Sequence, residues 1–517
     1  MGGAALLSGC GGGAPAPTVE RAPGARATSP ATTGPARSDL IRFAWWTDVG
    51  ALTPFQVSTA GPGGAMLLSL VYDTLTWKDE KGVVPWLASE WTTAEDGRSY
   101  TFRMADGVSW HDGEPLTAQD AAFSFTYYAT HPYRWMPTEV VESAEATGER
   151  EVRIQLKRPY AAFIGDIAGI VPIIPRHVWE DVADPVKYSG ANASTGSGPY
   201  KFAAHNEAEG TYRLTANAEY WRGRPKVAEW RQFAVPAEAR VAIVRQGEAD
   251  LSLTTDASVR DLLADDARLK VFETAPLSLV RLVFNTDRPP FDRKEVRQAV
   301  AYALDRRRIA ETITRGPAIV GSPGVIPPET PWHNPALRQY TLDAARAKEL
   351  MGGRKYTVKL IADTEAREPD LMAPMLEAVG ITLQVLRVDP PTRAQLLGEG
   401  AFQMALTAHI GVGGDPDYLR RWYAGEEANA FAQGSIFNNA EFDRLGEEQT
   451  TTLDPARRRS IVFKMQEILA EQLPTLVLYH RRFYWVYDPH AFTPMTTWGG
   501  VMNGIPFPNN KLALIGG

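Results

Sequence analysis

The chain has 517 residues, of which 44% are hydrophobic and 22% are charged, an ordinary composition for a globular protein with a large buried core. Its formal net charge of −7 argues against nucleic acid as a partner, and no Lys/Arg run with interleaved aromatic residues opposes that conclusion. No apolar stretch approaches the roughly 20 residues that a membrane-spanning helix needs. The length predicts two or three domains.

Cys10 is the only cysteine, which excludes disulfides within the chain and cysteine-rich metal sites. Residues 7–10 (LSGC) match the lipobox of bacterial lipoproteins, so we interpret residues 1–10 as a residual signal peptide and Cys10 as the lipidated residue. A chance cysteine in a Gly/Ala-rich leader is the alternative. Only nine residues precede Cys10, fewer than a charged n-region and an apolar h-region need, so we expect the start to lie further upstream.

Residues 11–38 consist mainly of Gly, Ala, Pro, Thr and Ser, with almost no large apolar side chain. Such a segment cannot bury enough surface to order itself, and it predicts a disordered tether. With about 28 residues its reach is on the order of 30 Å, enough to hold a domain off a membrane surface. The folded part is predicted to begin with a strand at residues 40–46, which ends in Trp45 and Trp46.

Turn dipeptides punctuate the first part of the folded chain. Asp-Gly pairs at 96–97 and 106–107 predict two turns, and the apolar residues between them alternate like one face of a strand. His111 precedes another Asp-Gly pair, so we interpret it as a turn residue rather than a base. Thr117 and Asp120 have the spacing of a capping box and predict the start of a helix.

The best-marked helix follows a strand predicted at residues 280–285. Asp292 is predicted as its N-cap with Glu295 as the capping-box partner, and the Arg-Gly-Pro sequence at 315–317 is predicted to end it. Helices and strands then alternate over residues 342–388, which indicates an α/β layer.

Seven short motifs, each with its own fixed spacing of residues, are distributed along the chain. They are 72–75 (YDTL), 85–88 (PWLA), 96–102 (DGRSYTF), 111–120 (HDGEPLTAQD), 194–202 (STGSGPYKF), 216–225 (ANAEYWRGRP) and 285–306. Together they resemble the signature of the family 5 solute-binding proteins of ABC importers, the receptors for peptides, dipeptides and nickel. The resemblance covers roughly residues 40–510, which is all of the predicted folded part.

The resemblance implies an α/β fold of the periplasmic-binding-protein type (type II), with two lobes that close on a solute. The strands near Phe284 and Tyr484 are expected to act as the hinge. The expected boundaries are 39–284 and 486–517 for lobe I, with an inserted subdomain at about 75–190, and 285–485 for lobe II.

The loop at 409–418 (HIGVGGDPDY) is the most diagnostic segment for the ligand. In peptide receptors of the resembling family, a tryptophan and, three residues later, an aspartate that pairs with the peptide's α-ammonium precede a GDPD-like sequence. Here His409 and Val412 stand at those two positions. A valine cannot neutralise a buried ammonium, so either Asp415 or Asp417 replaces the aspartate, or the ligand lacks a free amino terminus. A plain turn with an N-cap is the alternative role of these two aspartates.

A small-ligand site needs flat apolar walls and a few polar groups. The chain contains 14 Trp, 18 Tyr and 19 Phe, most of which we expect in the core. The candidates for ligand contact are Trp46, Tyr133, Trp135, His409, Asp415, Asp417, Trp422 and Trp498.

No catalytic constellation is found in the sequence, because it contains neither an H-E-x-x-H pair nor a G-x-S-x-G elbow. We therefore predict no enzymatic activity, no cofactor and no resident metal. A nickel chelate bound with help from His409 is a minor alternative, since one histidine is a weak metal signal.

The resemblance thus implies a monomeric, lipid-anchored substrate-binding protein of an ABC importer, at the outer face of the cytoplasmic membrane or in the periplasm. Its expected partners are an oligopeptide or similar small solute and the permease transmembrane subunits, with membrane contact only through the lipid anchor and no nucleic acid. The alternatives are a receptor of the same fold for an oligosaccharide, opine or metal chelate, a lipid-anchored hydrolase, and a receptor that signals to a partner protein.

Overall fold

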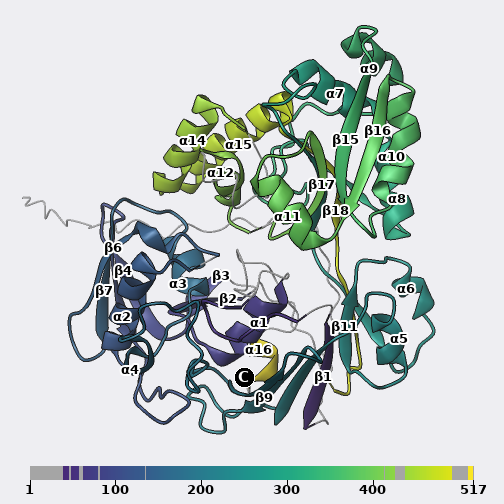
Figure 1. Cartoon of the computed structure of the whole chain (residues 1–517). Helices are drawn as coiled ribbons and strands as arrows, with labels where there is room; N and C mark the ends of the chain where they lie inside the picture. The colour runs from purple at the N-terminus through teal and green to yellow at the C-terminus, as the bar shows by residue number, and fades with distance from the viewer. Residues whose placement is uncertain are drawn as a thin grey trace, which may run out of the picture. The chain divides into compact units, whose positions relative to one another are not determined.

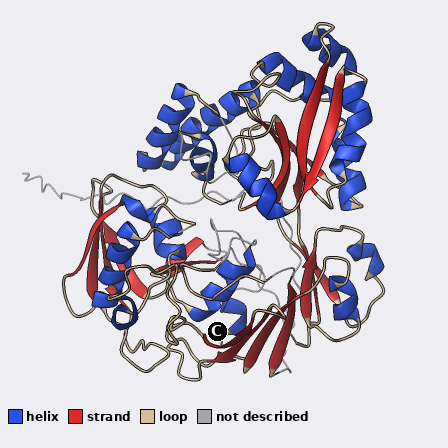
Figure 2. Ribbon diagram, in the orientation of Figure 1, coloured by secondary structure: helices blue, strands red, loops and turns tan. Residues whose placement is uncertain are grey.

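The described part of the chain has a mixed α/β fold in the computed structural model (Figures 1 and 2). Most strands belong to one seven-stranded, one six-stranded and one four-stranded sheet, which agrees with the predicted fold class. The structure describes residues 39–45, 48–57, 62–79, 82–133, 135–276, 278–412, 414–425, 437–491 and 511–515.

The seven-stranded sheet collects strands from both ends of the chain. β1 lies at its centre and pairs in parallel with β10 and β11. Helix α1 (Pro62–Val71) packs near β8, and helix α5 (Arg240–Arg245) packs near β11. The short α6 (Val259–Leu262) shares an apolar cluster with α5. In spatial order the strands are β12 (Lys270–Glu273), β19 (Tyr484–Tyr487), β11 (Leu251–Thr254), β1 (Leu40–Trp45), β10 (Glu229–Ala234), β9 (Thr211–Ala216) and β8 (Tyr200–Asn206).

The inserted subdomain carries the four-stranded antiparallel sheet. Both predicted Asp-Gly turns have positive φ at the glycine, and the strand between them buries alternate residues, as predicted. The capping box at Thr117 and Asp120 is also confirmed. The strands are β4 (Ala88–Thr93), β5 (Ser99–Met104), β7 (Glu151–Leu156) and β6 (Val141–Ala146), with β2 (Thr76–Asp79), β3 (Gly82–Pro85), α2 (Ala118–Thr130), η1 (Thr138–Val140), the π-helical η2 (Phe163–Ile167), α3 (Ala168–Ile170) and α4 (Arg176–Trp179) around them.

The six-stranded sheet has β13 near its centre, and all seven residues of this strand are buried because both faces of the sheet are covered. Its strands, in spatial order, are β14 (Ile319–Val320), β18 (Thr475–Arg481), β13 (Ser278–Phe284), β17 (Met404–Ile410), β15 (Tyr356–Asp363) and β16 (Ile381–Val388). The helices of this half are α7 (Lys294–Ala303), α8 (Arg306–Thr314), α9 (Ala344–Met351), α10 (Glu368–Glu377), α11 (Pro390–Gly398), α12 (Tyr418–Tyr423), α14 (Ala440–Thr451) and α15 (Pro455–Gln472).

Two connections cross between the large sheets, from β12 to β13 and from β18 to β19. Because β13 pairs with β17 and β18, the first crossing lies between Glu273 and Ser278, ahead of the expected lobe boundary at residue 284. The second lies between Arg481 and Tyr484. We call the seven-stranded sheet with its subdomain lobe I, and the six-stranded sheet with its helices lobe II.

The helix predicted from Asp292 is in fact two helices, α7 and α8. Leu304 has an extended backbone between them, and Asp305 caps α8 through its side chain. Asp292 does not cap α7, because the helix begins one residue later than predicted: Arg293 occupies the N-cap position and makes no side-chain cap bond. The amide of Asp292 donates to the carbonyl oxygen of Arg288 in the preceding turn, so it cannot form the predicted capping-box bond to Glu295.

His111 has the structural role that we predicted. Its Nδ1 accepts a hydrogen bond from the amide of Gly196 at 3.2 Å, and its Nε2 lies 3.0 Å from the carbonyl oxygen of Gly198. Burial lowers the pKa of His111 to about 4, so the ring is neutral at neutral pH. A Cβ at Gly196 would overlap the carbonyl oxygen of Val71 at the end of α1, so the turn at 194–202 requires glycine there.

A buried ion pair joins the short helix α16 (Lys511–Leu514) to lobe I. The ammonium of Lys511 lies 2.7 Å from Oδ1 of Asp73, and both side chains are fully buried. The ammonium also lies over the rings of Trp77 and Trp86, 4.3 and 4.6 Å from their centroids. The Asp73 carboxylate accepts further hydrogen bonds from four neutral donors: Trp86 at 2.7 Å, Tyr220 at 3.0 Å, Trp221 at 3.2 Å and Ser197 at 3.3 Å.

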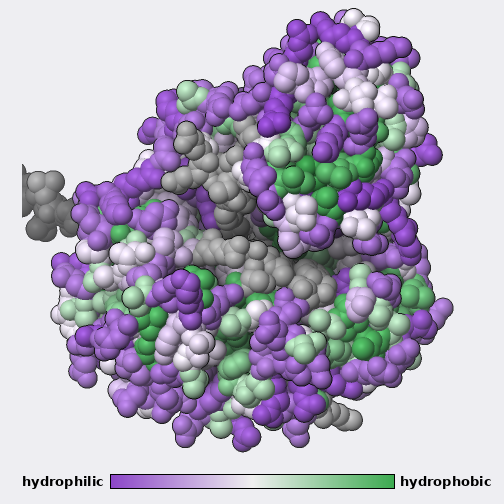
Figure 3. All heavy atoms as spheres, in the orientation of Figure 1, coloured by the Kyte–Doolittle hydropathy of each residue, from purple (hydrophilic) through white to green (hydrophobic). Residues whose placement is uncertain are grey.

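On the face drawn in Figure 3, hydrophilic residues predominate and hydrophobic residues form smaller patches between them. Among the described residues, the large apolar side chains are packed inside, in an extended and a smaller cluster in lobe I and three clusters in lobe II. Across the parts of the chain that the structure describes, every helix is too short or too polar to cross a bilayer.

Candidate functional site

The loop at 409–418 joins β17 to α12 in lobe II. β17 is held between β13 and β15, and Gly411 follows it with φ near 108°, a backbone conformation that favours glycine. The Asp415 carboxylate accepts a hydrogen bond from the amide of Asp417 at 2.9 Å, which forms the turn that leads into α12. Residues 415–417 therefore form a defined turn.

The ring of His409 packs against Trp422, which is fully buried in the lobe II core. Their ring centroids lie 4.1 Å apart, and Nδ1 of His409 lies 2.6 Å from the carbonyl oxygen of Ile410, which places the ring proton on that nitrogen. Burial, with a smaller contribution from the positive charge of Arg281, lowers the pKa of His409 to about 3. The imidazole is thus neutral and suited to stacking. The described residues contain no group of three or more potential metal ligands that includes it or any other histidine.

Asp415 is paired within lobe II. Its two carboxylate oxygens accept hydrogen bonds from the two terminal nitrogens of Arg458 on α15, at 2.6 and 2.7 Å. Burial disfavours the charged guanidinium, but the Asp415 carboxylate more than offsets it and raises the pKa of Arg458. This two-pronged geometry is typical of a strong buried Arg–carboxylate pair.

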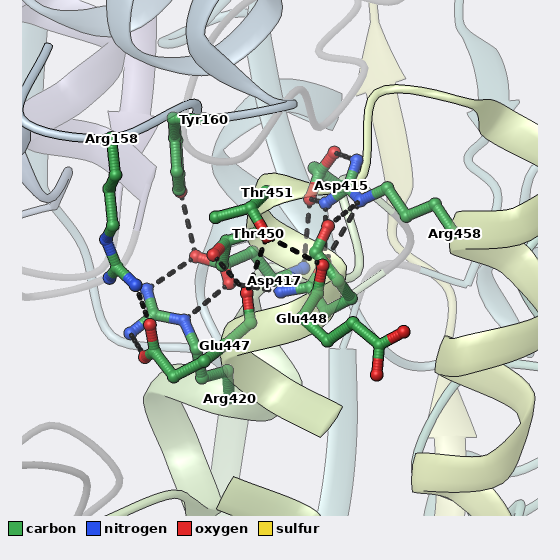
Figure 4. Close-up of polar contacts among 11 residues, drawn as sticks. Arg158, Tyr160, Asp415, Asp417, Arg420, Glu447, Glu448, Thr450, Thr451 and Arg458 are labelled. Atoms are coloured by element: carbon green, nitrogen blue, oxygen red, sulfur yellow. Dashed lines mark hydrogen bonds and ion pairs between the residues drawn. The ribbon is translucent and has the colours of Figure 1, made fainter. Parts of the chain in front are cut away.

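Asp417 is also fully engaged. Its Oδ1 accepts from Arg420 at 2.8 Å and from Gln449 at 2.6 Å, and its Oδ2 accepts from Arg420 at 2.9 Å and from Tyr160 at 2.8 Å. Burial alone would raise the pKa of this carboxyl, but the Arg420 guanidinium holds it well below its usual range. Figure 4 shows both aspartates among their partners.

The structure brings only part of the predicted site together. His409, Trp422 and the two aspartates share the loop region, whereas Tyr133 and Trp135 pack edge to face inside the lobe I core, with centroids 5.4 Å apart. Trp46, Trp498 and the predicted lipidation residue Cys10 lie outside the described residues.

The arginine, tyrosine and glutamine partners of the two aspartates were not among the predicted residues. Arg420 stands three residues after Asp417, a helical spacing that is visible in the sequence. Tyr160 and Arg458 lie far from the loop in the chain, and no local pattern marks them as partners.

A cavity of about 670 Å³, a size within the range of small-molecule sites, is lined by residues of lobe II and by Asp256 of lobe I. None of the predicted ligand-contact residues that the structure describes lines it. Asp256, which follows β11 of lobe I, forms an ion pair with Arg315 at the end of α8 in lobe II, with 3.1 Å between the charged atoms. Charged groups of both signs line this cavity: Asp256, Arg315, Asp363, Glu365, Arg367 and Arg481.

Two α/β lobes joined by two crossings, with a cavity at their junction, define the class of two-lobed binding proteins that close around a solute. The model of the bacterial extracellular solute-binding proteins, family 5 (Middle), matches residues 82–431, more than half of the chain. The chain belongs to this family.

Characterised relatives have related sequences over most of their length. The di/tripeptide-binding protein 1 of Pseudomonas aeruginosa is 26% identical over 455 residues, which are 80% of this chain and 84% of that protein. The heme-binding protein A of Haemophilus influenzae is 24% identical over 438 residues, 78% of this chain and 80% of that protein.

Solved structures share the fold. The periplasmic binding protein DppA of Helicobacter pylori, in complex with the peptide STSA, has a TM-score of 0.78 at 22% identity and covers 91% of this chain and 97% of its own. NikA of Brucella suis, in complex with Fe(III)-EDTA, has a TM-score of 0.77 at 22% identity and covers 91% of this chain and 99% of its own.

Proposed function

We propose that this protein captures a small solute between its lobes and delivers it to the membrane permease of an ABC importer, without chemical conversion of the solute. The observation that carries this proposal is the cavity of about 670 Å³ at the junction of two lobes that only two crossing segments connect. Its relatives include proteins named for the binding of di/tripeptides, heme and nickel, which supports solute capture as the shared activity.

The contacts of the loop at 409–418 limit the class of solute that can bind there. Asp415 and Asp417 each hold an arginine of their own lobe, and Val412 is fully buried in an apolar cluster. A solute ammonium at this loop would have to compete with one of these arginines for its buried carboxylate and would break an existing ion pair. We therefore propose a solute that brings no free ammonium to this loop, such as a peptide with a blocked amino terminus, an oligosaccharide or a metal chelate.

We also propose that Cys10 carries a lipid anchor, which would keep the protein at the outer face of the cytoplasmic membrane. The lipobox sequence at 7–10 supports this proposal. Expression with a radiolabelled fatty acid tests it. Label is expected in the wild-type protein and absent from Cys10→Ser, and an unlabelled wild type would contradict the proposal.

Native mass spectrometry of the freshly purified full chain tests solute capture. We expect a mass increment that disappears on mild denaturation and whose fragments identify the solute. His409→Ala is expected to lower the affinity for that solute about tenfold, because it removes one wall of the aromatic pair, whereas His131→Ala in the lobe I subdomain should leave it unchanged. A protein that carries no solute and binds none from a broad library of peptides, chelates and opines would refute the proposal.

A further inference from the structure

Lobe I also touches lobe II through the segment that follows β7, away from both crossings. The hydroxyl of Tyr160 donates to Oδ2 of Asp417 at 2.8 Å, and both side chains are almost fully buried. Burial raises the pKa of Tyr160 well above its ordinary value, so the hydroxyl keeps its proton as a donor. A hydroxyl that donates to a buried carboxylate is a strong, charge-assisted hydrogen bond.

Tyr160 is the partner that lobe I contributes to this carboxylate. Arg420 and Gln449, which supply the other three hydrogen bonds, both belong to lobe II. Withdrawal of Tyr160 leaves Oδ2 with one donor in a place that is closed to water. Separation of the lobes at this point therefore requires water to enter and solvate Asp417.

Two further contacts flank the hydroxyl. The amide of Ala161 donates to the carbonyl oxygen of Thr450 on α14 at 2.7 Å, and Arg158 forms an ion pair with Glu447 on the same helix. Burial, and after it the positive charge of Arg420, lowers the pKa of Arg158. Arg420 also lies within ion-pair distance of Glu447, at 3.6 Å, so this carboxylate sits between guanidiniums from the two lobes.

Figure 4 shows Arg158 and Tyr160 pointing from lobe I into this group of lobe II side chains. We propose that Arg158, Tyr160 and Ala161 of lobe I form a closure latch with Asp417, Glu447 and Thr450 of lobe II. The latch interactions exist only while the lobes are closed, and Asp417 ends the loop at 409–418. The latch thus raises the fraction of molecules in which the lobes are closed. It also fixes the position of the loop at 409–418 in the closed state, in which the solute is bound.

This inference rests on the proposed function only in taking solute capture as the purpose of lobe closure. The latch itself is testable without any solute, because the amide of Ala161 reports on it directly. Hydrogen exchange at this amide requires the bond to Thr450 to open, so its protection measures the closed population. We would follow the exchange of a peptide spanning residues 157–163 in the purified full chain by mass spectrometry.

Tyr160→Phe is expected to accelerate exchange at Ala161 about tenfold, which corresponds to about 1.4 kcal/mol. The change removes one hydrogen bond and leaves the ring and its packing in place. The amides of β5 and β7, which pair within lobe I, should keep their wild-type rates. Glu447→Gln removes the ion pair to Arg158 and is expected to accelerate the same amide, which provides a second variant if Tyr160→Phe fails to fold.

Tyr340→Phe is the matched control. The Tyr340 hydroxyl is equally buried, but it donates to the carbonyl oxygen of Ala470 within lobe II at 2.8 Å. Its removal should leave exchange at Ala161 unchanged. An unprotected Ala161 amide in the wild type, equal rates in the wild type and Tyr160→Phe, or an acceleration shared by β5 and β7 would overturn the latch. None of these results depends on whether a solute is found.

Discussion

The buried ion pair between Asp73 and Lys511 allows a sharp test of how the C-terminal helix stabilises lobe I. We predict that Lys511→Met strongly destabilises the protein. Methionine keeps most of the volume of the side chain but removes the ammonium, so the carboxylate of Asp73 loses its cation while it stays buried. Burial lowers the pKa of Lys511, and the ion pair with Asp73 opposes this shift.

The size of the effect follows from the surroundings of the carboxylate. Removal of one partner of a buried ion pair costs about 3–5 kcal/mol, because the other charge stays in a poorly solvating environment. Four neutral donors still contact Asp73, so we expect a value near the lower end, about 3 kcal/mol. For 517 residues the unfolding entropy is about 1.1 kcal/mol/K, which makes this a decrease of about 3 °C in Tm.

Urea unfolding followed by far-UV circular dichroism measures this loss, with thermal scans as a second readout. The control is Lys187→Met. Lys187 forms a similarly short ion pair with Asp184, at 2.8 Å against 2.7 Å for the buried pair, but its side chain is 85% exposed. Solvent screens the exposed pair, so the control should unfold like the wild type. Equal stability of Lys511→Met and the wild type, or equal losses in the two variants, would refute the reasoning.

Three further predictions concern acid, the turn at 194–202 and the loop. Burial lowers the pKa of His111 to about 4 and of His409 to about 3, so below pH 6.5 only the unfolded chain takes up these protons. Each should therefore lower the free energy of unfolding by about 2 kcal/mol between pH 7 and pH 5, and His111→Gln should make this urea-measured dependence shallower. Gly196→Ala should cost about 1–3 kcal/mol in urea unfolding because its Cβ overlaps the backbone of α1, whereas Gly148→Ala, with its nearest contact at 3.8 Å, should be neutral. Asp415→Asn should lower stability by about 3 kcal/mol and leave solute retention in native mass spectrometry unchanged, while lost retention would show that this carboxylate contacts the solute.

The sequence predicted turns and helix starts correctly where the structure depends only on residues that are close together in the chain. The Asp-Gly turns and the capping box at Thr117 and Asp120 each depend on residues within a few positions, and all are confirmed. Asp292 shows the limit of this approach. Its sequence context is that of an N-cap, but the preceding turn extends through Asp292 and the helix begins one residue later, a shift that the local pattern does not show.

Long-range partners could not be predicted from the chain alone. Strand pairing places β13 in the six-stranded sheet, although it directly follows β12 of the other sheet in sequence. The donors that surround Asp73 come from three of the recognised motifs and from the C-terminal helix. Only the folded chain shows that they converge on one carboxylate.

The charge balance of the buried aspartates also limits which solutes the loop at 409–418 can bind. A buried carboxylate cannot serve a structural arginine and a ligand ammonium at once without a third charge to balance them. Asp417 holds Arg420, and its one contact to lobe I is a neutral hydroxyl, from Tyr160. Closure therefore adds a donor to this carboxylate and leaves its charge balanced. A solute that brought its own ammonium to the loop would compete with the contacts that favour closure, whereas a solute bound by stacking against His409 would leave them intact.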